Sequence, residues 1–451
     1  MAPPATHSAS HPFITSPHRT LLRLSIPVLL SLIAEPMTGL ADTAFIARLG
    51  AAELAALGVG TVVMSSLFWI FNFLGIGTQT EVARSLGAGR TLRAREMATM
   101  ALLVATTLGL VLAAVGQAGV GPAATLMGAV GPVRAGATTY LAIRLAAAPA
   151  LLVTSTAFGA LRGLQDMRTP LRIAIAVNGL NVVLDAALIF GIGPVPALGI
   201  AGAALATVVS QWLGATWSLA AVRSRLGLTA RVHAVDALRL FTVGRDLVIR
   251  TGLLTAFILL TTRTATRLSA DAGAAHQAIR QVWMLSAMTL DAFAAAAQSL
   301  VGYFLGAARR DVARRVAGVA CAWSVATGIV LALGMWAGQE LVADWLVPEG
   351  ARALFFSAWL AAALFQPLNA VSFATDGIHW GSGDYRYLRN AMATATLAGA
   401  AALWFLEVGG GDTLARVWLI TGAWIAIRAV FGVLRIWPAI GASPFRPAGG
   451  T

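Results

Sequence analysis

The stretch QTEVARSLGAGR at residues 79–90 decides how the chain is organised, because a related stretch, QSLVGYFLGAAR, occurs at residues 298–309. The two align without a gap at a shift of 219 positions, and Gln, Val, Leu-Gly-Ala and Arg coincide. A second pair, GLQDMR at 163–168 and GSGDYR at 381–386, is shifted by 218. Two nearly equal shifts in distant parts of the chain indicate an internal duplication.

Each copy is too apolar to form the core of a soluble domain. Hydrophobic residues make up 58% of the 451 residues, charged residues make up 11%, and the mean hydropathy is +0.78, whereas soluble chains contain about 25% charged residues. A run of about 20 apolar residues can cross a bilayer as a helix. We therefore expect an all-α polytopic membrane protein with about twelve transmembrane helices, near residues 21–47, 53–79, 96–120, 136–160, 169–190, 198–222, 239–262, 276–303, 313–338, 351–375, 386–407 and 413–437.

The number of helices in each copy determines how the two copies insert. Because six is an even number, both copies cross the membrane in the same direction, as parallel repeats about an axis along the membrane normal. Two such repeats enclose a central cleft, and secondary transport is the commonest use of this arrangement. The predicted parts are a cytoplasmic N-terminal tail 1–20, an N-terminal six-helix lobe 21–222, a cytoplasmic inter-lobe linker 223–238, a C-terminal six-helix lobe 239–437 and a cytoplasmic C-terminal tail 438–451.

Arginine placement predicts the orientation of the helices. All 32 basic residues are arginines, and with a cytoplasmic N-terminus 24 of them fall on cytoplasmic loops, helix ends and tails. Cytoplasmic loops of membrane proteins carry an excess of positive charge, so both termini are predicted to be cytoplasmic. The Ala- and Arg-rich composition without lysine is typical of GC-rich bacterial coding, which predicts a bacterial inner (plasma) membrane.

The absence of lysine also argues against a nucleotide site of the Walker A type, which uses a lysine to reach the phosphates. An ion gradient is then the expected energy source. The arginines occur in short clusters between apolar segments, which argues against nucleic-acid binding. Cys321 is the only cysteine and the histidines form no HExxH pair, so we expect no disulfide, no metal and no cofactor apart from a coupling ion. The expected partners are a small-molecule substrate and the lipid bilayer, with the chain acting as a monomer.

One motif suggests an enzyme instead. GSGD at 381–384 is similar to the Gly-x-Gly-Asp of membrane aspartyl proteases, in which two close carboxylates share one proton. Asp384 and its repeat-mate Asp166 fall in predicted cytoplasmic turns, where Gly and Asp are ordinary turn residues. We therefore predict that the chain is not an enzyme, and a membrane-embedded enzyme remains a remote alternative.

Polar side chains at membrane depth are costly and mark candidate functional sites. Asn181 and Asp185 lie four residues apart, on one face of a predicted helix. With Asp42 and Thr207 they offer oxygen ligands, which suit a hard cation or a proton with its hydrogen-bond network. Desolvation favours the neutral carboxyl, so a buried acid can exchange a proton near neutral pH. Hydrogen bonding between helices is the alternative role, and Asp291 is a possible second acid site.

The stretch PVLLSLIAEPMTGLADTAFIARLG at 27–50 resembles the first helix of the multidrug and toxic compound extrusion (MATE) transporters, most of all their DinF branch. Other similar stretches are LGAGR at 86–90, NGLNVVLDAALIFG at 178–191, LDAFAAAAQSLVG at 290–302 and DGIHWGSGDY at 376–385. The resemblance implies a V-shaped bundle of two six-helix lobes that exports substrate against an inward flow of H⁺ or Na⁺. It places the family's first-helix acid on Asp42, its Asn-x-x-x-Asp on Asn181 and Asp185, and a sixth-helix partner on Thr207.

The first helix departs from the family pattern in one place. Pro27 matches a proline at which this helix is proposed to bend, and a proline lacks the N–H that would bond one turn back. Glu35 and Pro36 add a second acid and a second possible bend. Glu35 is a candidate second proton site, a counter-charge for a cationic substrate, or a neutral structural residue.

Methionine and aromatic side chains are the expected substrate contacts, because they offer adaptable apolar surface and attraction for lipophilic cations. The candidates are Met37, Met64, Trp69, Trp212, Trp283 and Met288. We therefore predict a secondary active antiporter that exports organic, lipophilic cationic compounds in exchange for H⁺ or Na⁺. One alternative is an exporter of an organic anion such as citrate, for which Arg263, Arg267 and Arg280 are the arginines to watch; a weaker one is a flippase for lipid-linked precursors.

Overall fold

The computed structural model describes residues 11–194, 196–406 and 412–446, apart from the side chain of Glu35, and in these residues the chain is built from helices. The elements of the first half are α2 Pro12–Thr15, α3 Pro17–Ala47, α4 Ala51–Trp69, the 3₁₀ turn η1 Ile70–Asn72, α5 Phe73–Gly87, α6 Thr91–Leu126, α7 Gly131–Leu145, α8 Ala148–Gly163, α9 Arg168–Phe190 and α10 Ile200–Arg225. Those of the second half are α11 Ala234–Leu268, α12 Ala270–Gly306, α13 Arg310–Ala337, α14 Gln339–Leu346, the 3₁₀ turn η2 Glu349–Ala351, α15 Arg352–Leu364, α16 Gln366–Ser382, α17 Tyr385–Trp404 and α18 Thr413–Ile436.

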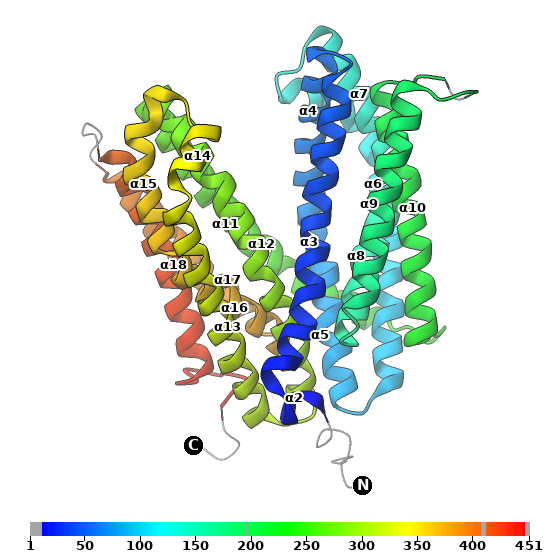
Figure 1. The fold of residues 1–451 in the computed structure, drawn as a ribbon. Helices are drawn as coiled ribbons and strands as arrows, with labels where there is room; N and C mark the ends of the chain where they lie inside the picture. The colour runs from blue at the N-terminus through cyan, green and yellow to red at the C-terminus, as the bar shows by residue number, and fades with distance from the viewer. Residues whose placement is uncertain (1–10, 195, 407–411, 447–451) are drawn as a thin grey trace. The chain divides into compact units, whose positions relative to one another are not determined.

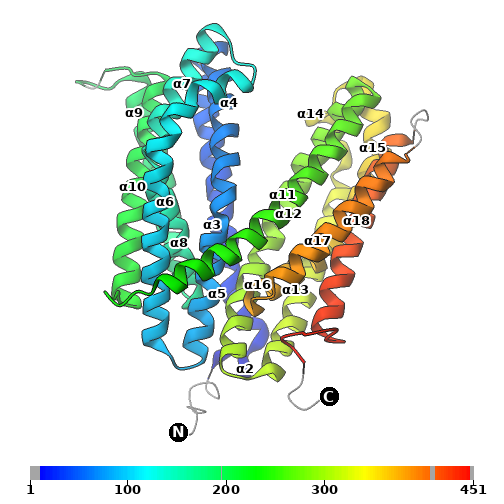
Figure 2. The same cartoon turned by 180° about the vertical axis from the view of Figure 1, so that it is seen from behind.

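The chain is divided into two compact units, and the divisions fall inside helices α3 and α11. The first unit is Ile26–Gly244, and the second unit is Met1–Ser25 together with Arg245–Thr451. Within the second unit, α2 and the C-terminal end of α18 lie at the same end (Figures 1 and 2). The sequence predicts a tail over residues 1–20, of which residues 1–10 lie outside the described residues, and a linker over 223–238; these bounds stay a prediction.

Aromatic packing explains why the N-terminal segment belongs to the second unit. The ring of His11 lies 4.9 Å from the rings of both Tyr303 and Phe304, and the ring of Phe13 lies 5.9 Å from that of Phe304. Phe13 is fully buried. Helix α2 and the start of α3 are thus held against the second unit, because the rings of His11 and Phe13 pack on α12.

Each of the twelve predicted segments coincides with a helix or a broken helix pair. Eight spans are long and apolar enough to cross a membrane, and there are up to ten if two bent pairs count as one span each. The bent pairs are α7 with α8, at 52°, and η2–α15 with α16, at 47°. The other two long helices, α11 and α17, are not among these spans; α11 carries several charged residues along its length, including Asp246 and Arg250.

Glycine contacts show that the duplication seen in the sequence is also a duplication of packing. A Cβ on Gly159 of α8 would collide with the carbonyl oxygen of Gly75 on α5, and a Cβ on Gly377 of α16 would collide with that of Ala294 on α12. The same holds one turn further along for two more pairs, Gly163 with Gln79 and Gly381 with Gln298. The two helix pairs are 218 or 219 positions apart in the sequence. Small residues allow membrane helices to approach this closely.

Candidate functional site

Three helices of the first unit bring the predicted polar residues together. Asp42 lies on α3, Asn181 and Asp185 lie on α9, and Thr207 lies on α10. Helices α9 and α10 pack side by side, as Figures 1 and 2 both show. Asn181 and Asp185 face the same way because they are one helical turn apart. Their relative exposure is 3% and 0%, so α9 turns its polar face into the unit.

The two carboxyl groups at the centre of this cluster are in contact. The side chains of Asp42 and Asp185 lie close enough to interact with each other. Two ionised carboxylates offer only acceptors and repel each other, whereas one added proton lets one carboxyl donate to the other. The second oxygen of Asp185, Oδ1, is buried and has no hydrogen-bond partner among the described residues, so it is free to accept a ligand.

The amide of Asn181 connects Asp42 with α10. In the orientation that satisfies both ends of the amide, Nδ2 donates to Asp42 Oδ1 over 3.3 Å, and the amide oxygen accepts from the backbone N–H of Thr207 over 3.2 Å. The hydroxyl of Thr207 lies 3.3 Å from that amide oxygen and 3.0 Å from the carbonyl oxygen of Ala203, and its single hydrogen serves one acceptor at a time. The amide thus places a donor on Asp42.

A positive charge lies close to this acidic pair. Arg144, near the end of α7, attracts both Asp42 and Asp185 electrostatically. Its guanidinium lies over the ring of Tyr140, 5.8 Å from the ring centroid. Its Nε and Nη1 are buried without a hydrogen-bond partner in the described part of the chain. Two carboxylates and one guanidinium carry one net negative charge, which a single bound H⁺ or Na⁺ neutralises.

Three other predicted site residues lie outside this cluster. The side chain of Glu35 lies outside the described residues. Asp291 belongs to α12 of the second unit, so it does not join Asp42 and Asp185 within one unit. Pro27 and Pro36 are both inside α3, which is one continuous helix from Pro17 to Ala47. Their role as bends stays a prediction, as do the absence of a metal and a cofactor.

The predicted substrate contacts separate into exposed and buried side chains. Met37, Trp69 and Trp212 are 59%, 56% and 44% exposed, and Met288 is half-buried. Met64 packs in a core of the first unit beside Leu141 and Leu145. Trp283 packs in the large core of the second unit. The apolar surface of Met64 and Trp283 is used in helix packing, and the role of all six residues as substrate contacts stays a prediction.

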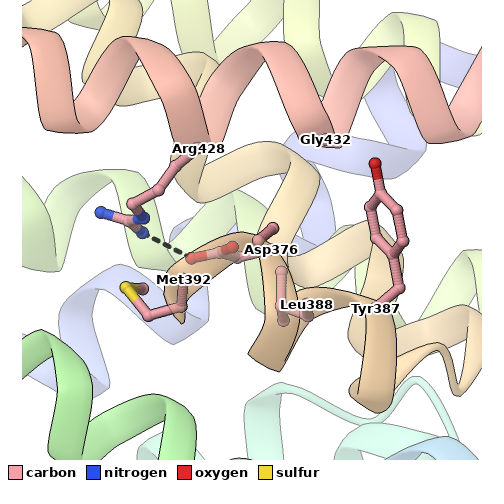
Figure 3. Close-up of a pocket in the computed structure, with 7 residues that line it drawn as sticks. Asp376, Tyr387, Leu388, Met392, Arg428 and Gly432 are labelled. Atoms are coloured by element: carbon pink, nitrogen blue, oxygen red, sulfur yellow. Dashed lines mark hydrogen bonds and ion pairs between the residues drawn. The ribbon is translucent and has the colours of Figure 1, made fainter. Parts of the chain in front are cut away.

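A second buried polar group lies in the second unit, and the sequence gives only a weak signal for it. Asp376 of α16 accepts hydrogen bonds from Arg250 of α11 and from Arg428 of α18, the latter over 2.8 Å. Both arginines belong to the set that the sequence assigns to the cytoplasmic side, but all three side chains are buried. The sequence indicates burial of these arginines only by their position: Arg250 lies well inside the predicted apolar segment 239–262, and Arg428 lies well inside 413–437. Figure 3 shows Arg428 and Asp376 facing each other beside Met392.

Comparisons with known proteins agree on one family. The family model MatE matches residues 27–187 and 248–404. The chain is 30% identical to Protein DETOXIFICATION 44, chloroplastic, of Arabidopsis thaliana, over 95% of this chain and 85% of that protein. It is 27% identical to DNA damage-inducible protein F of Escherichia coli (strain K12), over 94% and 93% of the two chains. A crystal structure of MATE in the bent conformation superposes with a TM-score of 0.85 at 21% identity, covering 95% of this chain and 97% of that one.

Proposed function

Because this chain belongs to the MatE family of multi-pass membrane transporters, whose members are not enzymes, we propose that it is a secondary active antiporter that exports an organic solute in exchange for H⁺ or Na⁺. The observation that carries this proposal is the contact between the carboxyls of Asp42 and Asp185, with the amide of Asn181 within hydrogen-bonding distance of Asp42. Paired acids inside a membrane bundle are the kind of group that holds a transported proton or cation.

Exchange of the coupling ion changes the charge of the cluster. With one H⁺ or Na⁺ bound, Asp42, Asp185 and Arg144 together are neutral. Release of the ion leaves one uncompensated negative charge, which is costly in a buried site. Ion binding and substrate binding then bias the transporter towards different conformations, as antiport requires.

The amide of Asn181 provides a way to pass this change from α3 to α10. Its Nδ2 donates to Asp42 and its oxygen accepts from the backbone N–H of Thr207. A hydrogen bond to an ionised carboxylate is stronger than one to a neutral carboxyl, so in this proposal the charge on Asp42 sets how firmly the amide holds α3 and α10 together.

The first candidate substrate is a lipophilic organic cation. It is supported by the exposed side chains of Met37, Trp69 and Trp212, which offer polarisable and aromatic surface. The second candidate is an organic anion such as citrate. It is supported by the net positive charge inside the second unit, at the Arg250–Asp376–Arg428 group. Arg263 and Arg267, which the sequence marks for this role, are exposed at the end of α11.

The arginine distribution supports placement of the chain in a bacterial plasma membrane with both termini in the cytoplasm. One similar protein is from Escherichia coli, and another is described as chloroplastic. Labelling of single cysteines introduced at the exposed residues Thr15 and Ala442, in a variant whose native Cys321 is replaced, with a reagent that does not cross the membrane, tests the orientation. Labelling of intact cells at either position would contradict it.

Efflux from proteoliposomes tests the proposed function. The purified full-length chain is given a pH gradient alone or a Na⁺ gradient alone, with a fluorescent lipophilic cation or labelled citrate inside. We expect efflux under one gradient and its loss in Asp42→Asn. Asp311→Asn is the matched control, because Asp311 has an exposed side chain on α13. Undiminished gradient-driven efflux by Asp42→Asn would overturn the assignment of the coupling site.

A further inference from the structure

The charges around the acidic pair of the first unit do not cancel one another. Arg144 of α7 is the only basic side chain that interacts electrostatically with Asp42 or Asp185 in the described part of the chain. Asn181 and Thr207, which complete the polar cluster, are uncharged. Two carboxylates and one guanidinium therefore leave one negative charge. Without Arg144 the same place would carry two.

A single apolar core holds α7 against the three helices that carry the polar cluster. It contains Tyr140 of α7 together with Ile46 of α3, Ile189 of α9 and Ala203 of α10. The ring of Tyr140 also lies directly on α4, because a Cβ on Gly60 would collide with it. The part of α7 that leads to Arg144 is thus fixed by packing on four sides.

Arg144 lies one helical turn from this core, at the level of the two acids. Asp42, Asp185 and Thr207 are each four residues from a member of the core on their own helix, as Arg144 is from Tyr140. Helices α3 and α9 run in one direction and α7 and α10 in the other, as Figures 1 and 2 show. All four steps of one turn, roughly 6 Å each, therefore point the same way.

Arg144 is held at this level without occupying the ligand positions of the acids. Its guanidinium lies over the ring of Tyr140, 5.8 Å from the centroid, and the last turn of a helix favours a positive charge. Nε and Nη1 of Arg144 have no hydrogen-bond partner among the described residues, and neither has Oδ1 of Asp185. Arg144 thus compensates a charge while an oxygen of Asp185 stays open to the coupling ion.

We propose that Arg144 takes the place of a second coupling ion and so fixes the stoichiometry at one monovalent cation per transport cycle. The proposal rests on the antiport function proposed above and adds its stoichiometry. One H⁺ or Na⁺ makes the cluster neutral, whereas a second would leave an excess positive charge in a buried site, which is costly. An arginine stays protonated inside a protein, so its compensation does not vary with pH.

The solute gradient that a fixed ion gradient can hold tests this stoichiometry. The full-length chain is reconstituted in proteoliposomes with the membrane potential clamped at zero, and the fluorescent lipophilic cation or labelled citrate is the probe. At zero net flux, a roughly tenfold ion gradient balances a roughly tenfold probe gradient for one ion per cycle and a roughly hundredfold gradient for two. We expect one ion per cycle for the wild-type chain and two for Arg144→Gln.

Two variants on the same helix serve as controls. Arg144→Lys keeps the positive charge, and Arg134→Gln removes an exposed arginine. Both should hold the same probe gradient as the wild-type chain. A wild-type gradient in Arg144→Gln would overturn the proposal, because the stoichiometry would then not depend on this charge.

A paired substitution keeps the test decisive if Arg144→Gln alone fails to fold. Asp185→Asn leaves one acid beside Arg144, so the cluster is neutral before an ion binds and gradient-driven efflux should fall. Adding Arg144→Gln to this variant restores one net negative charge, and efflux should recover. A purely structural role of Arg144 would make the double variant worse than Asp185→Asn, and that result would overturn the proposal.

The same measurements separate the failure of this proposal from that of the proposed function. Gradient-driven efflux by the wild-type chain at two ions per cycle would overturn the role of Arg144 and leave the antiporter intact. Absence of gradient-driven efflux from the wild-type chain with either probe would overturn the proposed function, and the stoichiometry with it.

Discussion

Helix α8 of the first unit and helix α16 of the second unit pack alike and carry different chemistry. Each presses glycines against the backbone of a partner helix, α5 in one unit and α12 in the other. At a shift of 218 positions, Phe158 of α8 corresponds to Asp376 of α16, and Asp185 of α9 corresponds to Leu403 of α17. The acidic pair and the arginine group therefore occupy different places in the two repeats. Both units contain the same close helix–helix contact at glycines, whereas their buried charged side chains lie at different positions of the repeat.

The largest expected effect tests the shared packing. Gly159→Leu and Gly377→Leu should both abolish recovery of folded protein, because a side chain at either position meets backbone that cannot move aside. Gly119→Leu is the control, since no atom lies within 4 Å of a Cβ at Gly119. Size-exclusion chromatography of the solubilised variants measures the outcome. If only one of the two variants gave a normal yield, the glycine contact would not be equally necessary in the two repeats.

Removal of the buried carboxylate of Asp376, in the second unit, should lower the stability of the protein strongly. Asp376→Asn leaves two buried guanidiniums without a counter-charge, and removing one partner of a buried ion pair costs about 3–5 kcal/mol. Asp246→Asn should cost less, because one of its arginines is largely exposed. Thermal unfolding of both variants measures the difference. Equal melting temperatures would show that the arginine group is solvated like an ordinary surface pair.

In the first unit, loss of the acid should affect transport more than stability. Asp185→Asn removes a carboxylate from the cluster, and hydrogen bonds to charged groups contribute about 1.5–3 kcal/mol. That range corresponds to roughly tenfold to hundredfold weaker binding of the coupling ion. Leu403→Asn, at the corresponding position of the other repeat, should change efflux less than twofold. Gradient-driven efflux measures both, and a large loss in Leu403→Asn would contradict the unequal roles of the repeats.

Removal of the positive charge of Arg144 should strengthen binding of the coupling ion, whereas loss of Asp185 should weaken it. Arg144 repels an incoming cation, so Arg144→Gln should lower the ion concentration for half-maximal efflux, roughly tenfold if the repulsion is about 1.4 kcal/mol. The control is Arg134→Gln, an exposed arginine on the same helix. A higher half-maximal concentration in Arg144→Gln would show that Arg144 supports ion binding instead.

The smallest effect concerns the hydroxyl that the amide of Asn181 contacts. Thr207→Ala removes one neutral hydrogen bond, worth about 0.5–1.5 kcal/mol, so efflux should fall by roughly twofold to tenfold. Thr207→Ser keeps the hydroxyl and should preserve most of the activity. Loss in Thr207→Ser equal to that in Thr207→Ala would point to the methyl group and to packing.

Much of the fold and of the acidic cluster could be predicted because the signals are local. Apolar run length marks the membrane helices, and two residues four apart must share a helix face, as Asn181 and Asp185 do. The arginine group could not be predicted in this way. Arg250, Asp376 and Arg428 lie on three helices that are far apart in the sequence, and the positive-inside count treats each arginine as a separate cytoplasmic charge.

By itself, the sequence determined a membrane protein built from two similar halves with acids on its first and fifth helices, because hydrophobicity and repeat spacing are properties of the chain alone. Only the tertiary structure decided which polar groups meet. It placed Arg144 beside the acidic pair, joined Arg250 and Arg428 on one carboxylate, and buried Met64 and Trp283 in helix packing. The reason is that burial and ion pairing depend on which helix faces are in contact, and a one-dimensional pattern does not contain that information.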